Sequence, residues 1–292
     1  DLELLTRLVD FTIRRDFPEH AQEPDVAKQR EQWFADVCER TAYMVAHWMR
    51  VGFVHGVMNT DNMSILGLAI DYGPYGWIDN FDPNWTPNTT DAQGRRYRYG
   101  HQPQIAFWNL TRLASALLPL FKDEEPLQRG LQRFGEVFVA TDRANAAAKL
   151  GFGTFADDDV DLLHSLYALL MSAEVDMTIF FRSLSEIDVN APTLAPLEEA
   201  FYDEDKRKAA EPHFLAWLAR YAQRVRADSL SPSERRKRMR SANPRYVLRN
   251  YLAQQAIDRA ERGDYAGIHE LLDVMRRPYD DQPGREHYAA KR

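Results

Sequence analysis

The residue types and spacings best suited to chemistry occur together between His55 and Gly73. His55 and Asn62 are seven positions apart, and Asp71 follows Asn62 by nine. Kinase-like folds carry an H-x-D-x-x-x-x-N loop and then a D-F-G-type aspartate, and the Asn and this second Asp bind the metal of the nucleotide. The spacing therefore predicts Asn62 and Asp71 as metal ligands, with Asp71 also at the bound nucleotide.

One position departs from this pattern. Val57 stands where the catalytic aspartate is usual, and it can neither accept a proton nor orient a hydroxyl. Asp61 is the nearest carboxylate that can replace it. His55 is expected to hold backbone through hydrogen bonds rather than to act as a base.

The metal prediction follows from the ligand preferences of Mg²⁺, which favours oxygen and is usually held by one or two protein groups together with phosphates and water. The amide oxygen of Asn62 and the carboxylate of Asp71 would face each other across a hairpin predicted over residues 63–70, with its turn at Leu66 and Gly67. A plainer interpretation stays open, because Asn and Asp in loops often form Asx-turns or helix caps.

The elements that must position these residues are mostly helical. Apolar residues recur every three or four positions from Pro24 to Arg50, which predicts a helix, and Gly52 is expected to end it. Residues 79–103 are predicted to form a long irregular segment, and loops of this length are usually functional or disordered. The further predicted helices span residues 104–120, 127–150, 158–183, 197–203, 213–227, 245–262 and 265–276.

Composition excludes several classes of protein. The formal net charge of −7 argues against a general nucleic-acid binder, and the basic run at residues 235–238 is expected to be a solvated helix face. Cys38 is the only cysteine, so neither an intramolecular disulfide nor a cysteine-rich zinc site can form. No apolar stretch reaches the length of a membrane-spanning helix. We therefore expect neither nucleic-acid nor membrane partners.

Longer runs resemble a known family. The segments HGVMNTDNMSILGLAIDYGPYGWID, residues 80–85 and YRYGHQPQIAFWNLTRLA resemble the signature of the selenoprotein O family. The later segments NPRYVLRNYLAQQAI and LLDVMRRPYDDQP are similar to the C-terminal region of that family. The resemblance covers nearly the whole chain in the same order.

The resemblance implies a protein-kinase fold in which ATP binds flipped, so that AMP passes to Ser, Thr or Tyr hydroxyls of protein substrates. It implies Asp61 as the proton acceptor and Asn62 and Asp71 as ligands of Mg²⁺ or Mn²⁺. We predict a mainly α chain with a small β-hairpin, α+β overall if an N-lobe is present. Residues 1–150 would form a kinase-like C-lobe, and residues 151–292 a helical C-terminal region.

The resemblance also implies nucleotide-binding motifs and a redox-active residue that this sequence does not contain. It has no G-x-x-x-x-G-K-[ST], G-x-G-x-x-G or V-A-I-K-like segment, so the N-lobe is expected upstream of residue 1. Residues 1–292 alone are then expected to fold but to be inactive. The redox-active C-terminal residue of the family is not found after Cys38. The implied compartment is the cytoplasm in a bacterium and the mitochondrion in a eukaryote.

Two other functions remain open from the residues themselves. A conventional kinase-like phosphotransferase would use the same metal pair. A catalytically dead pseudokinase acting as a binding module would explain Val57.

Overall fold

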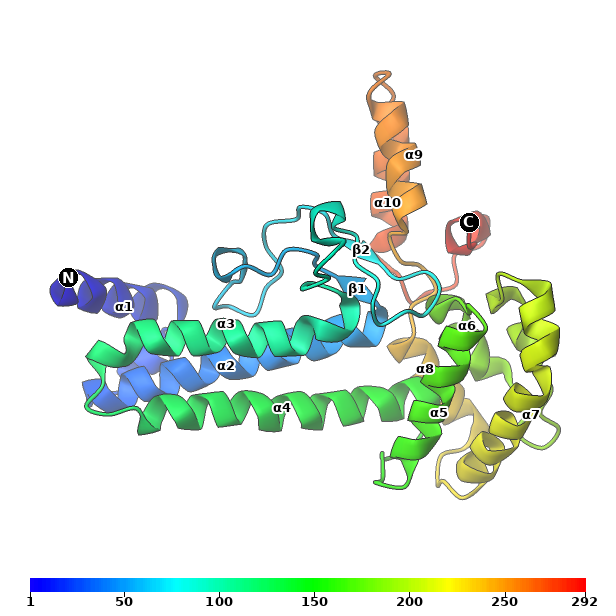
Figure 1. Cartoon of the computed structure of the whole chain (residues 1–292), viewed down its shortest axis with the longest axis horizontal. Helices are drawn as coiled ribbons and strands as arrows, with labels where there is room; N and C mark the ends of the chain where they lie inside the picture. Colours follow the sequence, from blue (N-terminus) through cyan, green and yellow to red (C-terminus); the bar gives the residue numbers. More distant parts are fainter.

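The computed structural model describes all residues 1–292 and is mainly helical, with one two-stranded antiparallel sheet (Figure 1). This confirms the mainly α class with a small β element. The helices are α1 (Leu2–Asp16), α2 (Val26–Val51), α3 (Gln102–Leu117), α4 (Glu125–Leu150), α5 (Asp159–Ser172), α6 (Met177–Ser183), α7 (Glu204–Arg226), α8 (Pro232–Ala242), α9 (Asn250–Ala260) and α10 (Ala266–Met275). None of these helices is long and apolar enough to cross a bilayer.

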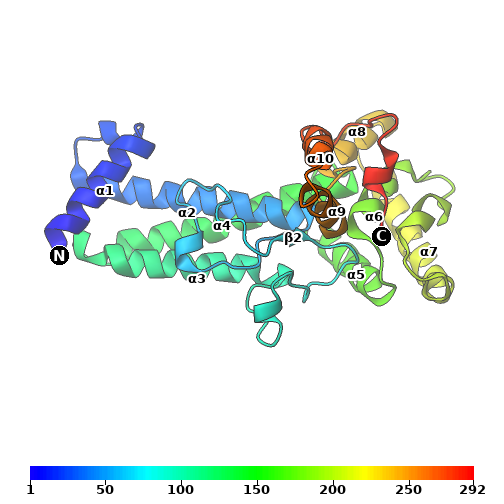
Figure 2. The same ribbon diagram turned by 90° about the horizontal axis from the view of Figure 1, so that it is seen from above.

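Helices α2, α3 and α4 lie side by side as a long layer, and α1 crosses one end of it (Figures 1 and 2). Asp25 begins α2 by accepting from the backbone N–H groups of Ala27 and Lys28. Gly52 ends it in the left-handed conformation at φ 76°. The apolar faces of these helices form the first core, around Phe34, Val45 and their neighbours.

A second core lies among helices α5 to α8. Trp217 is buried there and its indole N–H donates to the Leu162 carbonyl at 2.8 Å. The same core includes Val54, Ile78 and Tyr99 from the first half of the chain. The segment that carries the chemical residues is therefore packed against both halves, and a domain boundary near residue 150 stays a prediction.

The sheet does not lie where the hairpin was predicted. Strand β1 (Phe53–Val54) pairs with β2 (Gly76–Trp77), whereas residues 63–70 form only one isolated bridge, between Met63 and Ala69. Phe53 and Trp77 pack with their ring centroids 5.0 Å apart, and this aromatic pair lies across the two strands. The turn predicted within residues 63–70 does form, since Gly67 adopts φ 66°.

The helix predicted over residues 158–183 was wrong as a single element, because it is broken between α5 and α6. Glu174 has φ 51°, and Val175 pairs with Phe201. Asp176 donates its N–H to the Ala200 carbonyl at 2.7 Å and then caps α6. A pairing with a distant segment thus overrides the helical periodicity.

The helix predicted over residues 245–262 begins only at Asn250, and the one over residues 197–203 is a 3₁₀ turn at Ala195–Ala200. Arg245 and Tyr246 donate their N–H groups to the Pro278 carbonyl instead of to a helix. Helices α9 and α10 then form a hairpin that projects from the body near the sheet (Figure 1).

Candidate active site

The loop that follows β1 carries the chemical residues, and side-chain amides hold its backbone. Gln102 donates to the Phe53 carbonyl at 2.9 Å and accepts from the His55 N–H at 3.0 Å. Asn109 donates to the Met58 carbonyl at 2.9 Å. Because Gln102 and Asn109 are both buried on α3, the loop is fixed to that helix.

A third amide supports the same loop from the irregular segment. Asn88 is buried and donates to the Gly56 carbonyl at 3.0 Å. Its own oxygen accepts from the N–H and the hydroxyl of Thr90. The predicted long segment is thus irregular, yet it helps to position the loop.

Sequence reasoning missed these three amides, although a signal existed for two of them. Gln102 and Asn109 are seven residues apart, so they share one face of α3 with the apolar Ile105 and Ala106. Polar residues repeated on a buried helix face must find partners. The partners here are backbone groups of the loop.

Gly56 is required where the loop meets the segment after Asp71. Its φ is 81°, and a Cβ there would lie 2.2 Å from the Pro74 carbonyl oxygen. Both the left-handed conformation and the close approach exclude a side chain. The contact fixes the His55 loop against the Asp71–Pro74 turn.

We expect Gly56→Ala to lower the free energy of unfolding by about 2 kcal/mol or more, through strain and backbone collision. Urea denaturation followed by circular dichroism measures the loss. Gly135→Ala is the matched control: Gly135 lies in α4, and a Cβ there would meet no neighbouring atom within 4 Å, so alanine should stabilise slightly. Equal effects at the two positions would contradict the assignment.

His55 has the structural role expected for it. It is 1% exposed, and its Nε2 lies 2.7 Å from the Ile70 carbonyl oxygen. A hydrogen bond to a carbonyl requires the proton on Nε2. The ring therefore ties the loop to the residue before Asp71, and Nδ1 is buried without a partner.

Asn62 is oriented by the residue that replaces the usual aspartate. Its Nδ2 donates to the Val57 carbonyl at 3.1 Å, within a 3₁₀ turn at Thr60–Asn62. Once Nδ2 is engaged, Oδ1 is the atom left for a ligand. Val57 thus acts through its backbone and not through its side chain.

Asp61 and Asp71 are both exposed, and neither carboxylate has a hydrogen-bond or ion-pair partner in the chain. The antiparallel Met63–Ala69 bridge closes a reversal of the chain, with Asn62 directly before it and Asp71 two residues after it. Asp71 itself adopts φ 55°. The bridge and the contact of His55 with the Ile70 carbonyl hold the chain before Asp71 against the loop that carries Asp61 and Asn62.

These residues fit an Mg²⁺ half-site by their donor chemistry: one amide oxygen and one unpaired carboxylate, both hard oxygen ligands. The tightest cluster of carboxylate and imidazole groups is elsewhere, at Glu19, His20 and Asp36. Arg40 already pairs there with Glu19 at 2.7 Å and with Asp36 at 2.8 Å. A guanidinium therefore already pairs with both carboxylates of that cluster.

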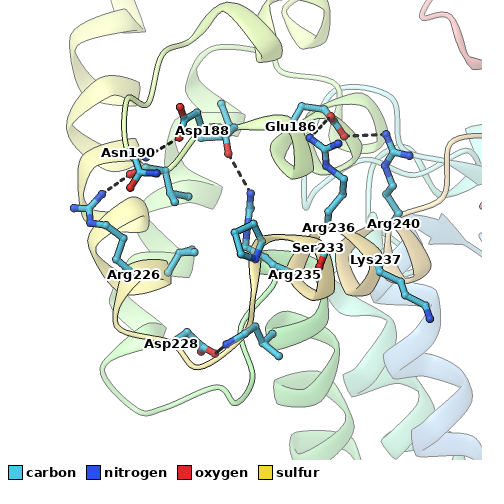
Figure 3. A pocket seen from close by; sticks show the side chains of 15 residues that line it. Glu186, Asp188, Asn190, Arg226, Asp228, Ser233, Arg235, Arg236, Lys237 and Arg240 are labelled. Carbon is cyan, nitrogen blue, oxygen red and sulfur yellow. Dashed lines mark hydrogen bonds and ion pairs between the residues drawn. The ribbon is translucent and has the colours of Figure 1, made fainter.

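A cavity of about 1010 Å³ lies away from this loop, lined by the segment after α6, the end of α7 and α8 (Figure 3). Part of the basic run lines it, and the expectation of a solvated face was wrong for one member. Arg235 is buried and donates to the Tyr221 hydroxyl and the Ile187 carbonyl, both at 3.1 Å. Arg236 pairs with Glu186 at 3.0 Å.

Comparisons with known proteins agree with the resemblance. The family model described as protein adenylyltransferase SelO matches residues 1–276. A protein nucleotidyltransferase YdiU of Xanthomonas axonopodis pv. citri is 63% identical over 292 residues, which cover 100% of this chain and 56% of that protein. One of Aromatoleum aromaticum, with the same description, is 62% identical over 100% of this chain and 55% of its own length. The chain thus spans about half the length of these curated relatives.

Proposed function

This chain belongs to the protein adenylyltransferase SelO family, and from that membership we propose that it carries the catalytic loop for transfer of AMP from ATP to protein hydroxyl groups. The observation that supports the proposal within the molecule is that Asp61, Asn62 and Asp71 flank the chain reversal closed by the Met63–Ala69 bridge, next to a loop held by buried amides. The substrates are ATP and Ser, Thr or Tyr side chains of proteins.

Each residue has a separate role in the proposal. Asp61 is exposed and unpaired, so its carboxylate is free to accept the proton of the attacking hydroxyl. Asn62 Oδ1 and the Asp71 carboxylate would hold Mg²⁺, which neutralises charge on the phosphates when bound. The rest of the loop keeps these groups in place.

The kinase-like arrangement is part of the same proposal. In chain order, the buried His55 comes first, and Asn62, which donates to the Val57 carbonyl, follows it. Asp71 comes after the chain reversal closed by the Met63–Ala69 bridge. This order matches the H-x-D-x-x-x-x-N and D-x-G pattern, except that the base is shifted from position 57 to Asp61. We propose that residues 1–150 are a kinase-like C-lobe on this basis.

The test combines product mass with one variant in the full-length protein. Incubation with MgATP and a protein substrate should add the mass of an AMP moiety to the substrate. Asp61→Asn should lower kcat by roughly 10²–10⁴-fold with the Kd for ATP unchanged, because a base acts on the rate. Asp61 has no partner in the chain, so folding should be unaffected.

Other outcomes would favour the alternative functions or remove the role of Asp61. Addition of a phosphoryl group would indicate a phosphotransferase of conventional orientation. Absence of any turnover, with nucleotide or a partner still bound, would indicate a binding module. Weak ATP binding with normal kcat in Asp61→Asn would remove the proton-acceptor role.

A further inference from the structure

A groove begins beside the proposed proton acceptor. It has a volume of about 320 Å³ and is lined by Thr60, the residue before Asp61, and by Val37, Ile65 and Leu113 among others. Its walls are α2, α3 and the chain at residues 60–65. No residue between 70 and 79 lines it, so the groove follows α2 and α3 and not the Asp71 turn.

The groove also contains an unpaired polar atom. Asn109 lines it and is 6% exposed, and its Oδ1 has no hydrogen-bond partner. The Nδ2 of the same side chain is engaged by the Met58 carbonyl. Buried acceptors normally have a donor, so this atom favours a ligand that brings an N–H or O–H group.

A cationic patch borders the groove. Arg112 lines its rim, and Arg112 and Arg96 both lie over the exposed Trp108 ring, at 5.4 and 4.7 Å from its centroid. Neither arginine has an ion-pair partner, and the nearby Arg95 and Arg98 donate only to backbone carbonyls or a histidine. Although the chain has a net charge of −7, this group of unpaired arginines creates a local positive potential that attracts acidic ligands.

The patch is connected to the catalytic loop. Arg96 directly precedes Tyr97, whose hydroxyl donates to the Asn59 side chain. Asn59 is two residues before Asp61. A ligand bound to the arginines and in the groove would therefore lie next to the proposed proton acceptor.

We propose that this groove and its arginines dock the protein substrate, through a segment that carries an apolar side chain and acidic residues near the acceptor hydroxyl. The proposal rests on the proposed function and deepens it. The apolar side chain would fill the groove, a backbone N–H would reach Asn109 Oδ1, and the carboxylates would meet Arg96 and Arg112.

The experiment measures peptide binding to the full-length protein without ATP, by fluorescence anisotropy. One labelled peptide carries a serine, a nearby leucine and several glutamates, and the matched peptide has lysines in place of the glutamates. The acidic peptide should bind, and the basic one should bind at least about tenfold more weakly at low salt. Raising the salt concentration should reduce the difference.

Two variants test the site. Arg96→Gln with Arg112→Gln should weaken binding of the acidic peptide about fivefold or more. Ala116→Glu places a carboxylate on the exposed groove wall and should have a similar effect without loss of core packing. The control is Lys237→Gln with Arg262→Gln, which removes the same charge from exposed residues elsewhere and should leave binding unchanged.

Transfer kinetics with the same peptides separate the two proposals. Binding of the acidic peptide without AMP transfer would contradict the proposed function and leave the docking site in place. AMP transfer with equal KM values for the acidic and basic peptides would overturn the docking site alone. If the variant with Arg96→Gln and Arg112→Gln has a raised KM for ATP and an unchanged KM for the peptide, the arginines bind the nucleotide phosphates. That result would also overturn the docking site.

Discussion

If the proposed AMP transfer is the activity of the full-length protein, Asp71→Ala is expected to reduce it by about 10³-fold or more while the protein remains folded. Asp71 supplies the only carboxylate of the proposed metal pair, and phosphate chemistry depends on charge neutralisation and positioning. The side chain is exposed and has no partner in the chain, so its removal should not disturb packing. Product formation over a range of Mg²⁺ concentrations measures the effect.

A second substitution separates loss of the ligand from loss of backbone geometry. Asp71 has φ 55°, a conformation that Asn tolerates better than Ala does. Asp71→Asn should therefore keep the turn and still lose activity, with a thermal midpoint close to that of the unchanged protein. Full activity of either variant at saturating ATP would exclude Asp71 as a metal ligand.

The predictable parts of the fold were those with long periodic patterns. The apolar period over residues 24–50 and the glycine after it correspond to α2 within a few residues. The strands β1 and β2 have two residues each, too few for an alternating pattern to be visible. The hairpin was therefore expected at residues 63–70, where Gly67 marked a turn.

Breaks in helices were not predictable for a different reason. The interruption before Asp176 depends on Ala200 and Phe201, which contact it only in the folded chain. Local sequence holds no information on such partners. The same holds for the residues before Asn250, which are not helical. Arg249 there donates to the buried carboxylate of Asp176, a partner far away in the sequence.

Residue types, spacing and the family resemblance predicted which residues form the candidate site, and this stays a prediction; they did not predict the contacts that hold its loop. Spacing pointed to His55, Asn62 and Asp71, the lack of an aspartate at Val57 pointed to Asp61, and the family resemblance supported these roles. The amide contacts from Asn88 and Asn109 depend on how distant segments pack. Asn88 lies in an irregular segment, where no periodic pattern marks a residue as buried.

A buried ion pair links the C-terminal region to the strand that follows this site. Arg249 is 1% exposed and donates to Asp176 at 2.7 and 3.1 Å, and also to Asp79, two residues after β2. Burial disfavours the charged guanidinium, but hydrogen bonding and the charge of Asp176 outweigh it and raise the pKa of Arg249. Tyr202 donates to Asp176 at 2.8 Å, and burial and the neighbouring carboxylate raise the pKa of this phenol.

The residue after Arg249 closely approaches the sheet. A Cβ at Gly76 would lie 2.5 Å from Oδ1 of Asn250, the residue after Arg249. Asp79 meanwhile accepts the Met177 N–H on its carbonyl at 2.9 Å, next to Asp176. The C-terminal segment is thus held against β2 by one charged contact and one tight fit.

Arg249→Met is expected to lower the free energy of unfolding by about 3–5 kcal/mol, because it leaves Asp176 buried without its cation. Arg245→Met is the control: its pair with Asp281 is partly exposed and should contribute about 1 kcal/mol or less. Adding Asp176→Asn to Arg249→Met should recover part of the loss, since it removes the unpaired charge. Urea unfolding of the unchanged protein, the two single variants and the double variant measures each free energy of unfolding. Equal losses for Arg249→Met and Arg245→Met, or no recovery in the double variant, would show that the buried pair does not hold the C-terminal segment to the strand beside the site.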